Sequence, residues 1–269
     1  MPNSINARAT GYFWLFILSC SWAATSFSFD KNRPLQAATL IYPPYQYLEN
    51  GEPKGIAVEI IREAVKRTGV KQVNFKFYPW NRAVYSTQFG QSDILFNAGK
   101  NEARQLWGQY IDSTLILQKY LLFKRRDVAI QVNPNFSNVN NRSIAIRLGY
   151  LYGTGPFRQA LDGNKFSEVV HSNSTQHSVD LLLGGRVDFF VGDRLPVMHY
   201  LKEHKLHDKI DVIKETDNPA HNMQVLEWPT YILFSKKTIA SEYVNEVNAA
   251  MESMRKDGFI QDVIKKYGN

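Results

Sequence analysis

One carboxylate, Asp193, follows directly on a short apolar strand predicted at residues 187–191 and is the first candidate for chemistry. In an open α/β sheet, ligands bind at the carboxyl ends of the strands, so this position presents the Asp193 side chain to a cleft. Asp is also a common N-cap, and a helix containing Pro196 follows, which gives Asp193 an alternative structural role. Position alone leaves both roles open.

Aromatic rings and cations follow the other predicted strands. The first half of the chain places Tyr42, Tyr45, Trp80, Lys100 and Arg104 at strand ends, and the second half places Arg147, Tyr150, His171 and Asp193 there. This set complements a zwitterion with an apolar or planar body, because a guanidinium binds a carboxylate and a carboxylate binds an ammonium. The plainer alternatives are that the tyrosines and Trp80 belong to a core, and that Glu102 pairs with Arg104 locally.

Alternating strands and helices must position these side chains. Strands are predicted at 37–41, 73–77 and 93–96, with helices at 56–65 and 80–89 between them. A second series follows an Asn-rich bridge at 133–141, with strands at 143–147, 168–171, 187–191 and 210–213 and helices at 156–161 and 175–183. Short connections between strands and helices predict parallel sheets, and two such series predict two lobes with a cleft between them.

Two further strands, at 119–123 and 231–234, are predicted to cross between the lobes and to form the hinge. Two helices are predicted near the C-terminus, with no further strand beside them in the sequence. They are expected to dock on the first lobe. The expected fold is therefore α/β with two lobes. Lobe 1 comprises residues 27–122 and 234–269, and lobe 2 comprises residues 123–233 with the hinge strands at its ends.

The first 26 residues are predicted to be a cleaved secretory signal that sends the chain to the periplasm. They contain one charged residue, Arg8, then an apolar run at 12–18, then small residues. The run is shorter than the roughly 20 apolar residues that span a bilayer. Cys20 would allow a lipoprotein anchor, but Leu18 stands where that processing signal has a small residue.

The net charge and the cysteine content exclude some kinds of function for this chain. The formal net charge is +7, and Cys20 is the only cysteine. The processed chain is therefore expected to lack disulfides, thiol nucleophiles and thiolate metal sites, and no cofactor or metal is expected. Basic residues are dispersed and the chain is expected to be exported, which favours a soluble basic surface or an anionic small ligand over nucleic acid.

A series of short motifs occurs in a characteristic order: Tyr42-Pro43-Pro44-Tyr45, Gly55-Ile56-Ala57-Val58-Glu59-Ile60, Pro79-Trp80-Asn81-Arg82-Ala83, Ser92-Asp93-Ile94, Glu102-Ala103-Arg104, Gly185-Arg186-Val187-Asp188, Asp257-Gly258 and Ile264-Lys265-Lys266-Tyr267. From about Leu35 to the end, the chain resembles the family 3 extracellular solute-binding proteins. These are periplasmic receptors of polar amino acid ABC transporters and have the type II periplasmic binding protein fold.

The resemblance implies roles for individual residues. Arg104 would bind a ligand carboxylate through two parallel hydrogen bonds, and Asp193 would bind the ligand ammonium. Tyr45 and Trp80 would sandwich the ligand between their rings. The first-lobe strand order would be two, one, three, with the crossing strand joining the sheet.

Two positions depart from the family pattern. Asn101 stands where a Thr or Ser usually precedes the Arg by three residues, and Gly149 is followed by Tyr150 where a Thr or Ser is usual. Lys100, Arg147 and Arg194 would enlarge a cationic site for a ligand with additional negative charge.

The expected function is capture of a small polar ligand, an amino acid or related carboxylate, by closure of the two lobes. The expected partner is an ABC permease in the inner membrane or, alternatively, a membrane signalling receptor, and the protein is expected to act as a monomer. An enzyme is the other alternative, a periplasmic dehydratase of the same fold, for which His171 or Glu227 would supply the general acid. The sequence contains no recognisable catalytic motif.

Overall fold

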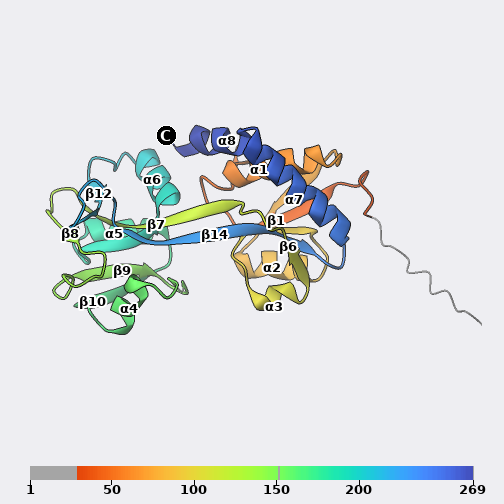
Figure 1. Ribbon diagram of the computed structural model, residues 1–269. Helices are drawn as coiled ribbons and strands as arrows, with labels where there is room; N and C mark the ends of the chain where they lie inside the picture. Colours follow the sequence, from red (N-terminus) through yellow and green to blue (C-terminus); the bar gives the residue numbers. More distant parts are fainter. Residues whose placement is uncertain (1–28, 151, 269) are drawn as a thin grey trace, which may run out of the picture.

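The structure is a computed structural model that describes residues 29–150 and 152–268, and these fold into two lobes joined by two long strands (Figure 1). The predicted signal segment at 1–26, Cys20 included, lies outside the described residues. The mixed α/β class, the two lobes and the crossing strands agree with the sequence prediction.

The first lobe is built on three parallel strands, β1 (Leu35–Thr39), β4 (Val73–Phe77) and β5 (Ile94–Ala98). Strand β1 pairs with both of the others, which is the predicted order of two, one, three. The helices are α1 (Ile56–Arg67), α2 (Trp80–Gln88), the short α3 (Glu102–Gln105), α7 (Ser241–Lys256) and α8 (Phe259–Gly268). The β2 (Tyr47–Glu49) and β3 (Glu52–Lys54) hairpin and β6 (Gly108–Tyr110) complete the lobe.

The C-terminal helices return to the first lobe, as expected. Val247, Met251 and Met254 of α7 pack in one hydrophobic core with Ile60 and Ile61 of α1. The apolar face that repeats along α7 is buried there, and burial of this kind is the main source of helix stability in a globular protein.

The second lobe contains three further parallel strands, β9 (Ser143–Arg147), β10 (Glu168–Ser172) and β11 (Phe189–Asp193). Its helices are α4 (Pro156–Asp162), α5 (Thr175–Leu183) and α6 (Arg194–Glu203). Three short strands complete it: β12 (Ile210–Val212) pairs with the end of the strand at 116–125, and β8 (Gln131–Val132) and β13 (Lys214–Glu215) form a separate two-stranded sheet. Two hydrophobic cores, one on each face of the sheet, hold these layers together.

The crossing strands β7 (Ile116–Arg125) and β14 (Gln224–Ser235) pair with each other in antiparallel register. Strand β7 also pairs with β11, and β14 also pairs with β5, so one sheet runs through both lobes in the order β10-β9-β11-β7-β14-β5-β1-β4. Both strands are longer than predicted because pairing continues through polar positions. This register places Gln118 opposite Trp228 between the lobes.

Strand β11 lies two residues later than predicted, and this shift brings Asp193 into the strand itself. Asp188 instead accepts hydrogen bonds from the Ser143 backbone N (2.8 Å) and Oγ (2.9 Å), which fixes the start of β11 beside β9. Asp193 pairs in register with Tyr120 of β7. The last residue of the strand therefore stands at the junction of the lobes.

Gly55 supports the loop that carries Tyr42 and Tyr45, and its replacement by Ala is expected to destabilise the first lobe. Its φ is +114°, and an added Cβ would lie 2.5 Å from the Tyr45 carbonyl oxygen. Strain of this backbone conformation costs roughly 1–3 kcal/mol before the clash is counted. Gly69→Ala is the matched control, because Gly69 has φ +87° but open space around it. Urea unfolding should show a clearly larger decrease in the free energy of unfolding for Gly55→Ala than for Gly69→Ala. Equal decreases would contradict the role of close packing at Gly55.

Candidate ligand-binding site

A cavity of about 440 Å³ lies between the lobes, at the ends of the strands. Its lining comes from both lobes and both crossing strands: Leu40, Tyr42, Trp80, Asn97, Gly99, Lys100, Asn101, Arg104, Gln118, Tyr120, Gly149, Tyr150, Tyr152, Leu226, Trp228 and Thr230. The volume falls within the range that holds small ligands in proteins. Five of the eight residues predicted for the site, namely Tyr42, Trp80, Lys100, Arg104 and Tyr150, meet here.

Arg104 is held in place at the wall of this cavity by three contacts. Asn101 caps α3, and its Oδ1 accepts a hydrogen bond from the Arg104 backbone N (3.2 Å). One guanidinium nitrogen donates to the Gly99 carbonyl oxygen (3.1 Å), and the Arg104 Cζ lies 5.3 Å from the centroid of the Trp80 ring. A guanidinium has five N–H donors, so donors remain for a carboxylate in the cavity.

The indole of Trp228 in β14 lies against the backbone at Gly99. A Cβ at Gly99 would lie 2.7 Å from Trp228 Nε1, so only glycine admits the ring at this distance. Lys100 Nζ, next along the chain, lies 4.5 Å from the centroid of the Tyr231 ring. The loop after β5 is thereby packed against β14, with its two cations at the cavity.

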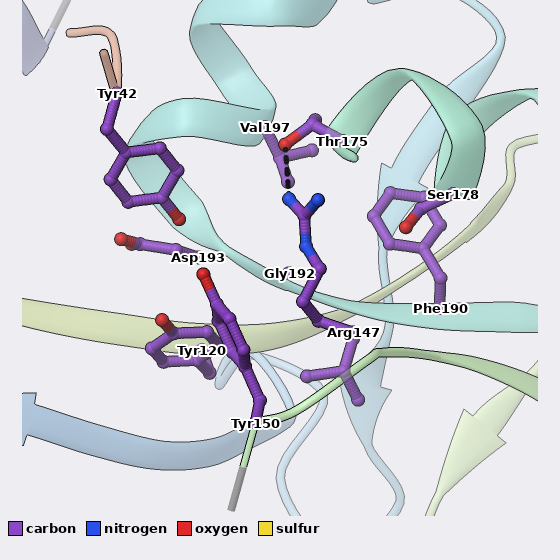
Figure 2. A pocket seen from close by; sticks show the side chains of 11 residues that line it. Tyr42, Tyr120, Arg147, Tyr150, Thr175, Ser178, Phe190, Gly192, Asp193 and Val197 are labelled. Carbon is purple, nitrogen blue, oxygen red and sulfur yellow. Dashed lines mark hydrogen bonds between the residues drawn. The ribbon is translucent and has the colours of Figure 1, made fainter. Parts of the chain in front are cut away.

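A second, much smaller cavity of about 10 Å³ lies beside Asp193 (Figure 2). Tyr42, Tyr120 and Tyr150 line both cavities and so separate them. Figure 2 shows the hydroxyl ends of these three rings turned toward the carboxylate of Asp193. A space of this size holds about one water molecule or one head group of similar size.

Asp193 is 3% exposed and has one unpartnered oxygen. Its Oδ1 accepts a hydrogen bond from the Tyr45 hydroxyl (3.0 Å), whereas Oδ2 has no hydrogen-bond partner. Burial raises the pKa of Asp193 to about 7, and the hydrogen bond from Tyr45 and the nearby backbone N–H groups of Leu195 and Lys119 offset only part of that rise. Asp193 also occupies the N-cap position of α6, although its side chain makes no capping hydrogen bond of ordinary geometry there.

Tyr45 does not have the position that the sequence predicted for it. Its ring is 1% exposed, belongs to the first-lobe core and lines neither cavity. The chain turns between Tyr42 and Tyr45, so Tyr42 presents its ring to both cavities while Tyr45 points inward and reaches Asp193. Tyr45 thus does not face either cavity as the sandwich role predicted for it requires, whereas Tyr42 lines both of them.

Comparison with known proteins identifies the family of this chain. The profile of the bacterial extracellular solute-binding proteins, family 3, matches residues 35–269. The chain belongs to this family. The resemblance drawn from the motifs is confirmed, and so is its extent from about Leu35 onward.

Similar proteins include two curated relatives from Bacillus subtilis (strain 168). The L-cystine-binding protein TcyA is 25% identical over 229 residues, which cover 84% of this chain and 77% of the relative. The probable amino-acid-binding protein YxeM is 23% identical over 261 residues, which cover 95% and 91%. An ancestral arginine-binding protein bound to arginine has a similar structure, with a TM-score of 0.65, 19% identity and coverage of 89% of this chain and all of that one. The fold is that of the type II periplasmic binding proteins, and the homologues are binding proteins.

Arg147 lines the small cavity of this family member but points away from Asp193. A guanidinium nitrogen donates to Thr175 Oγ1 (3.3 Å) at the start of α5, as Figure 2 shows. The Arg147 Cζ also lies 5.8 Å from the centroid of the Tyr150 ring. Arg147 therefore positions Tyr150 and α5, and Arg194, the other cation considered, lines neither cavity.

The two residues considered as general acids lie away from both cavities. Glu227 forms an ion pair with Lys119 (3.2 Å), and the His171 side chain is exposed. Within residues 29–150 and 152–268, no cluster of three or more His, Cys, Asp or Glu is arranged to hold a metal ion. A search of the same residues found no helix long and apolar enough to cross a membrane.

The sequence prediction missed several residues of the lining, above all those on the crossing strands. Gln118 and Tyr120 alternate with exposed neighbours in β7, a period-two pattern that indicates one buried face. The sequence does not carry this signal, because Leu117 is the exposed residue and Gln118 the buried one, so apolar and polar residues do not alternate there. Nothing in the sequence indicates that Trp228 packs on Gly99 or that Tyr152 faces the cavity, because those contacts depend on the approach of the two lobes.

Proposed function

We propose that this chain captures a free amino acid, or a closely related carboxylate, and delivers it to an ABC permease. Arg104 binds the carboxylate in the large cavity, and Asp193 receives the ammonium through its free oxygen. The observation that carries the proposal is the unpartnered Oδ2 of a buried Asp193 beside a space for one small group. The curated relatives, one named for L-cystine and one for amino acids, support the same ligand class.

Binding of a zwitterion would connect the two cavities. Tyr42, Tyr120 and Tyr150 stand between Arg104 and Asp193, so at least one ring turns aside when a ligand enters. Tyr150 suits this role because it is 39% exposed and lies in the loop after β9. Burial raises the pKa values of Tyr42, Tyr120 and Tyr150, so their hydroxyls stay protonated and can donate to the ligand or to Asp193.

Closure of the lobes couples ligand capture to delivery. The moving bodies are residues 27–122 with 234–269, and residues 123–233, which rotate about β7 and β14. A ligand held by Arg104 of one lobe and Asp193 of the other stabilises the closed form, which presents surfaces of both lobes to a membrane partner. We place this activity in the periplasm, after removal of residues 1–26. A membrane sensor in place of the permease would use the same closed form.

A thermal-shift screen with matched analogues tests the ligand class. The purified chain is unfolded and refolded to remove bound ligand, and then mixed with amino acids and their deaminated and decarboxylated counterparts. A ligand at 100 times its dissociation constant adds about 2.7 kcal/mol of stability. We expect the largest shift when carboxylate and ammonium are both present, a smaller one with the deaminated carboxylates and the smallest with the decarboxylated amines. An equal shift with the decarboxylated amines would contradict the proposal.

A further inference from the structure

The charges around the large cavity have one sign. Lys100 and Arg104 line it, and among the described residues no Asp or Glu does so. Asp193 stands behind the three tyrosines and is taken up, in the proposed function, by the α-ammonium of the ligand. The rest of the ligand therefore enters a cavity without any carboxylate to receive a second positive charge.

Aromatic rings often bind cations, but here protein cations already occupy ring faces. The Arg104 Cζ lies 5.3 Å from the Trp80 centroid, and the Arg147 Cζ lies 5.8 Å from the Tyr150 centroid. A cationic ligand group would compete with them and be repelled by them. Two of the lining rings are therefore already engaged by protein cations, and a basic side chain entering the cavity would meet the positive charges of Lys100 and Arg104 without a carboxylate to offset them.

The size and lining of the cavity indicate a large, flat occupant. Six rings line its 440 Å³, those of Tyr42, Trp80, Tyr120, Tyr150, Tyr152 and Trp228. Leu40 and Leu226 add apolar surface. Rings prefer to pack edge-to-face or offset-stacked on other rings, which gives such a cavity selectivity for planar groups beyond the area buried.

We infer that the ligand is an α-amino acid whose side chain is bulky, planar and without positive charge, because a cavity of six rings and two cations with no carboxylate receives the side chain. The inference rests on the proposed function and adds the side-chain class. It distinguishes this chain from its arginine-bound structural relative, whose ligand carries a cationic side chain. Aromatic amino acids fit this class, whereas basic and very small amino acids do not.

Isothermal titration of the refolded wild-type chain tests the inference directly. The probes are L-phenylalanine, L-tyrosine and L-tryptophan against L-arginine, L-lysine and L-alanine. We expect at least one aromatic amino acid to bind roughly ten-fold or more tightly than L-arginine or L-lysine, because like charges brought together cost several kcal/mol. Equal or tighter binding of L-arginine, L-lysine or L-alanine would overturn the inference.

Gln118→Glu provides a second test within the same cavity. Gln118 is buried, and its Oε1 accepts a hydrogen bond from the Tyr120 hydroxyl (3.2 Å), a contact that a carboxylate of the same shape retains. The variant should bind L-arginine roughly ten-fold or more tightly than the wild type does, because it supplies the missing negative charge. Gln109→Glu is the matched control, since Gln109 accepts from Ser241 Oγ (2.8 Å) outside the cavity. An equal gain in both variants would attribute the effect to net charge and contradict the inference.

The two proposals fail in different ways. If basic amino acids bind best and binding still requires Arg104, the proposed function holds and the side-chain inference is wrong. If no amino acid of either panel binds, or if binding does not require Arg104, the proposed function itself fails. Titration of the wild type and of an Arg104→Ala variant thus separates the two.

Discussion

Replacement of Arg104 by Ala is expected to weaken the binding of every carboxylate ligand by roughly 30- to 5,000-fold, which corresponds to the 2–5 kcal/mol lost when one member of a buried charge pair is removed. The ligand carboxylate would be desolvated in the closed cavity with no guanidinium to receive it. The effect should be equal for ligands that differ only in their side chains, because the carboxylate is common to all of them. Isothermal titration with the best ligand of the panel measures the loss.

Two variants control for the general effect of removing an arginine. Arg82 also lies over an aromatic ring of the first lobe, with its Cζ 4.9 Å from the Tyr78 centroid, but it lines neither cavity. Arg82→Ala should therefore leave affinity unchanged. Arg104→Lys keeps the charge and loses the paired donors, so it should bind with intermediate affinity. An Arg104→Ala variant with wild-type affinity and wild-type stability would rule out the carboxylate role.

The positions of Arg104, Trp80 and Asp193 could be predicted because they depend on local patterns. Each stands at or after the end of a strand whose apolar residues are visible in the sequence, and the topology of parallel strands brings such ends to one edge. The order of β4, β1 and β5 follows from the same reasoning. Small errors in strand limits, such as the two-residue shift of β11, did not change which residues stand at that edge.

Contacts between distant segments could not be predicted in this way. Tyr42 and Tyr45 are three residues apart with the same side chain, and only the packing of the loop on Gly55 and the first-lobe core decides which ring faces the cavity. Trp228 reaches Gly99 only because β14 runs between the lobes. Helix α3 has four residues, too few for a periodic pattern, and depends on the Asn101 cap. The separation of the two cavities likewise results from three tyrosines that come from three different elements.

Asp193 should make both stability and ligand binding depend on pH. Burial raises the pKa of Asp193 to about 7, above its ordinary value of 3.8. Between about pH 4 and pH 7 the unfolded chain is therefore ionised at this site while the folded chain keeps the proton, so the folded state binds more protons. Stability from this group is present below pH 4, falls as the pH rises to about 7 and is constant above that, with a total change of roughly 4 kcal/mol.

The Asp193→Asn variant isolates this contribution because its amide does not titrate. Urea unfolding measures the free energy of unfolding of both proteins. From pH 4 to pH 7 the value for the wild type should fall relative to that of the variant, and above pH 7 the difference should stay constant. Tyr45→Phe removes the hydrogen bond to Oδ1 and should move the upper end of this window to higher pH. A constant difference across the range would mean that Asp193 is ionised throughout in the folded state.

Ligand binding should show the opposite trend, because an ammonium favours the ionised form of Asp193. Binding then releases a proton below about pH 7, so the affinity of an amino acid should rise with pH up to that point and level off above it. At pH 8 Asp193→Asn should weaken amino acid binding by roughly 30- to 5,000-fold and abolish this pH dependence. Deaminated analogues provide the internal control, since they have no ammonium and should not bind more weakly to the variant than to the wild type. If the variant loses affinity equally for amino acids and for their deaminated analogues, Asp193 acts by holding the two lobes together through Tyr45. The ammonium then has another acceptor.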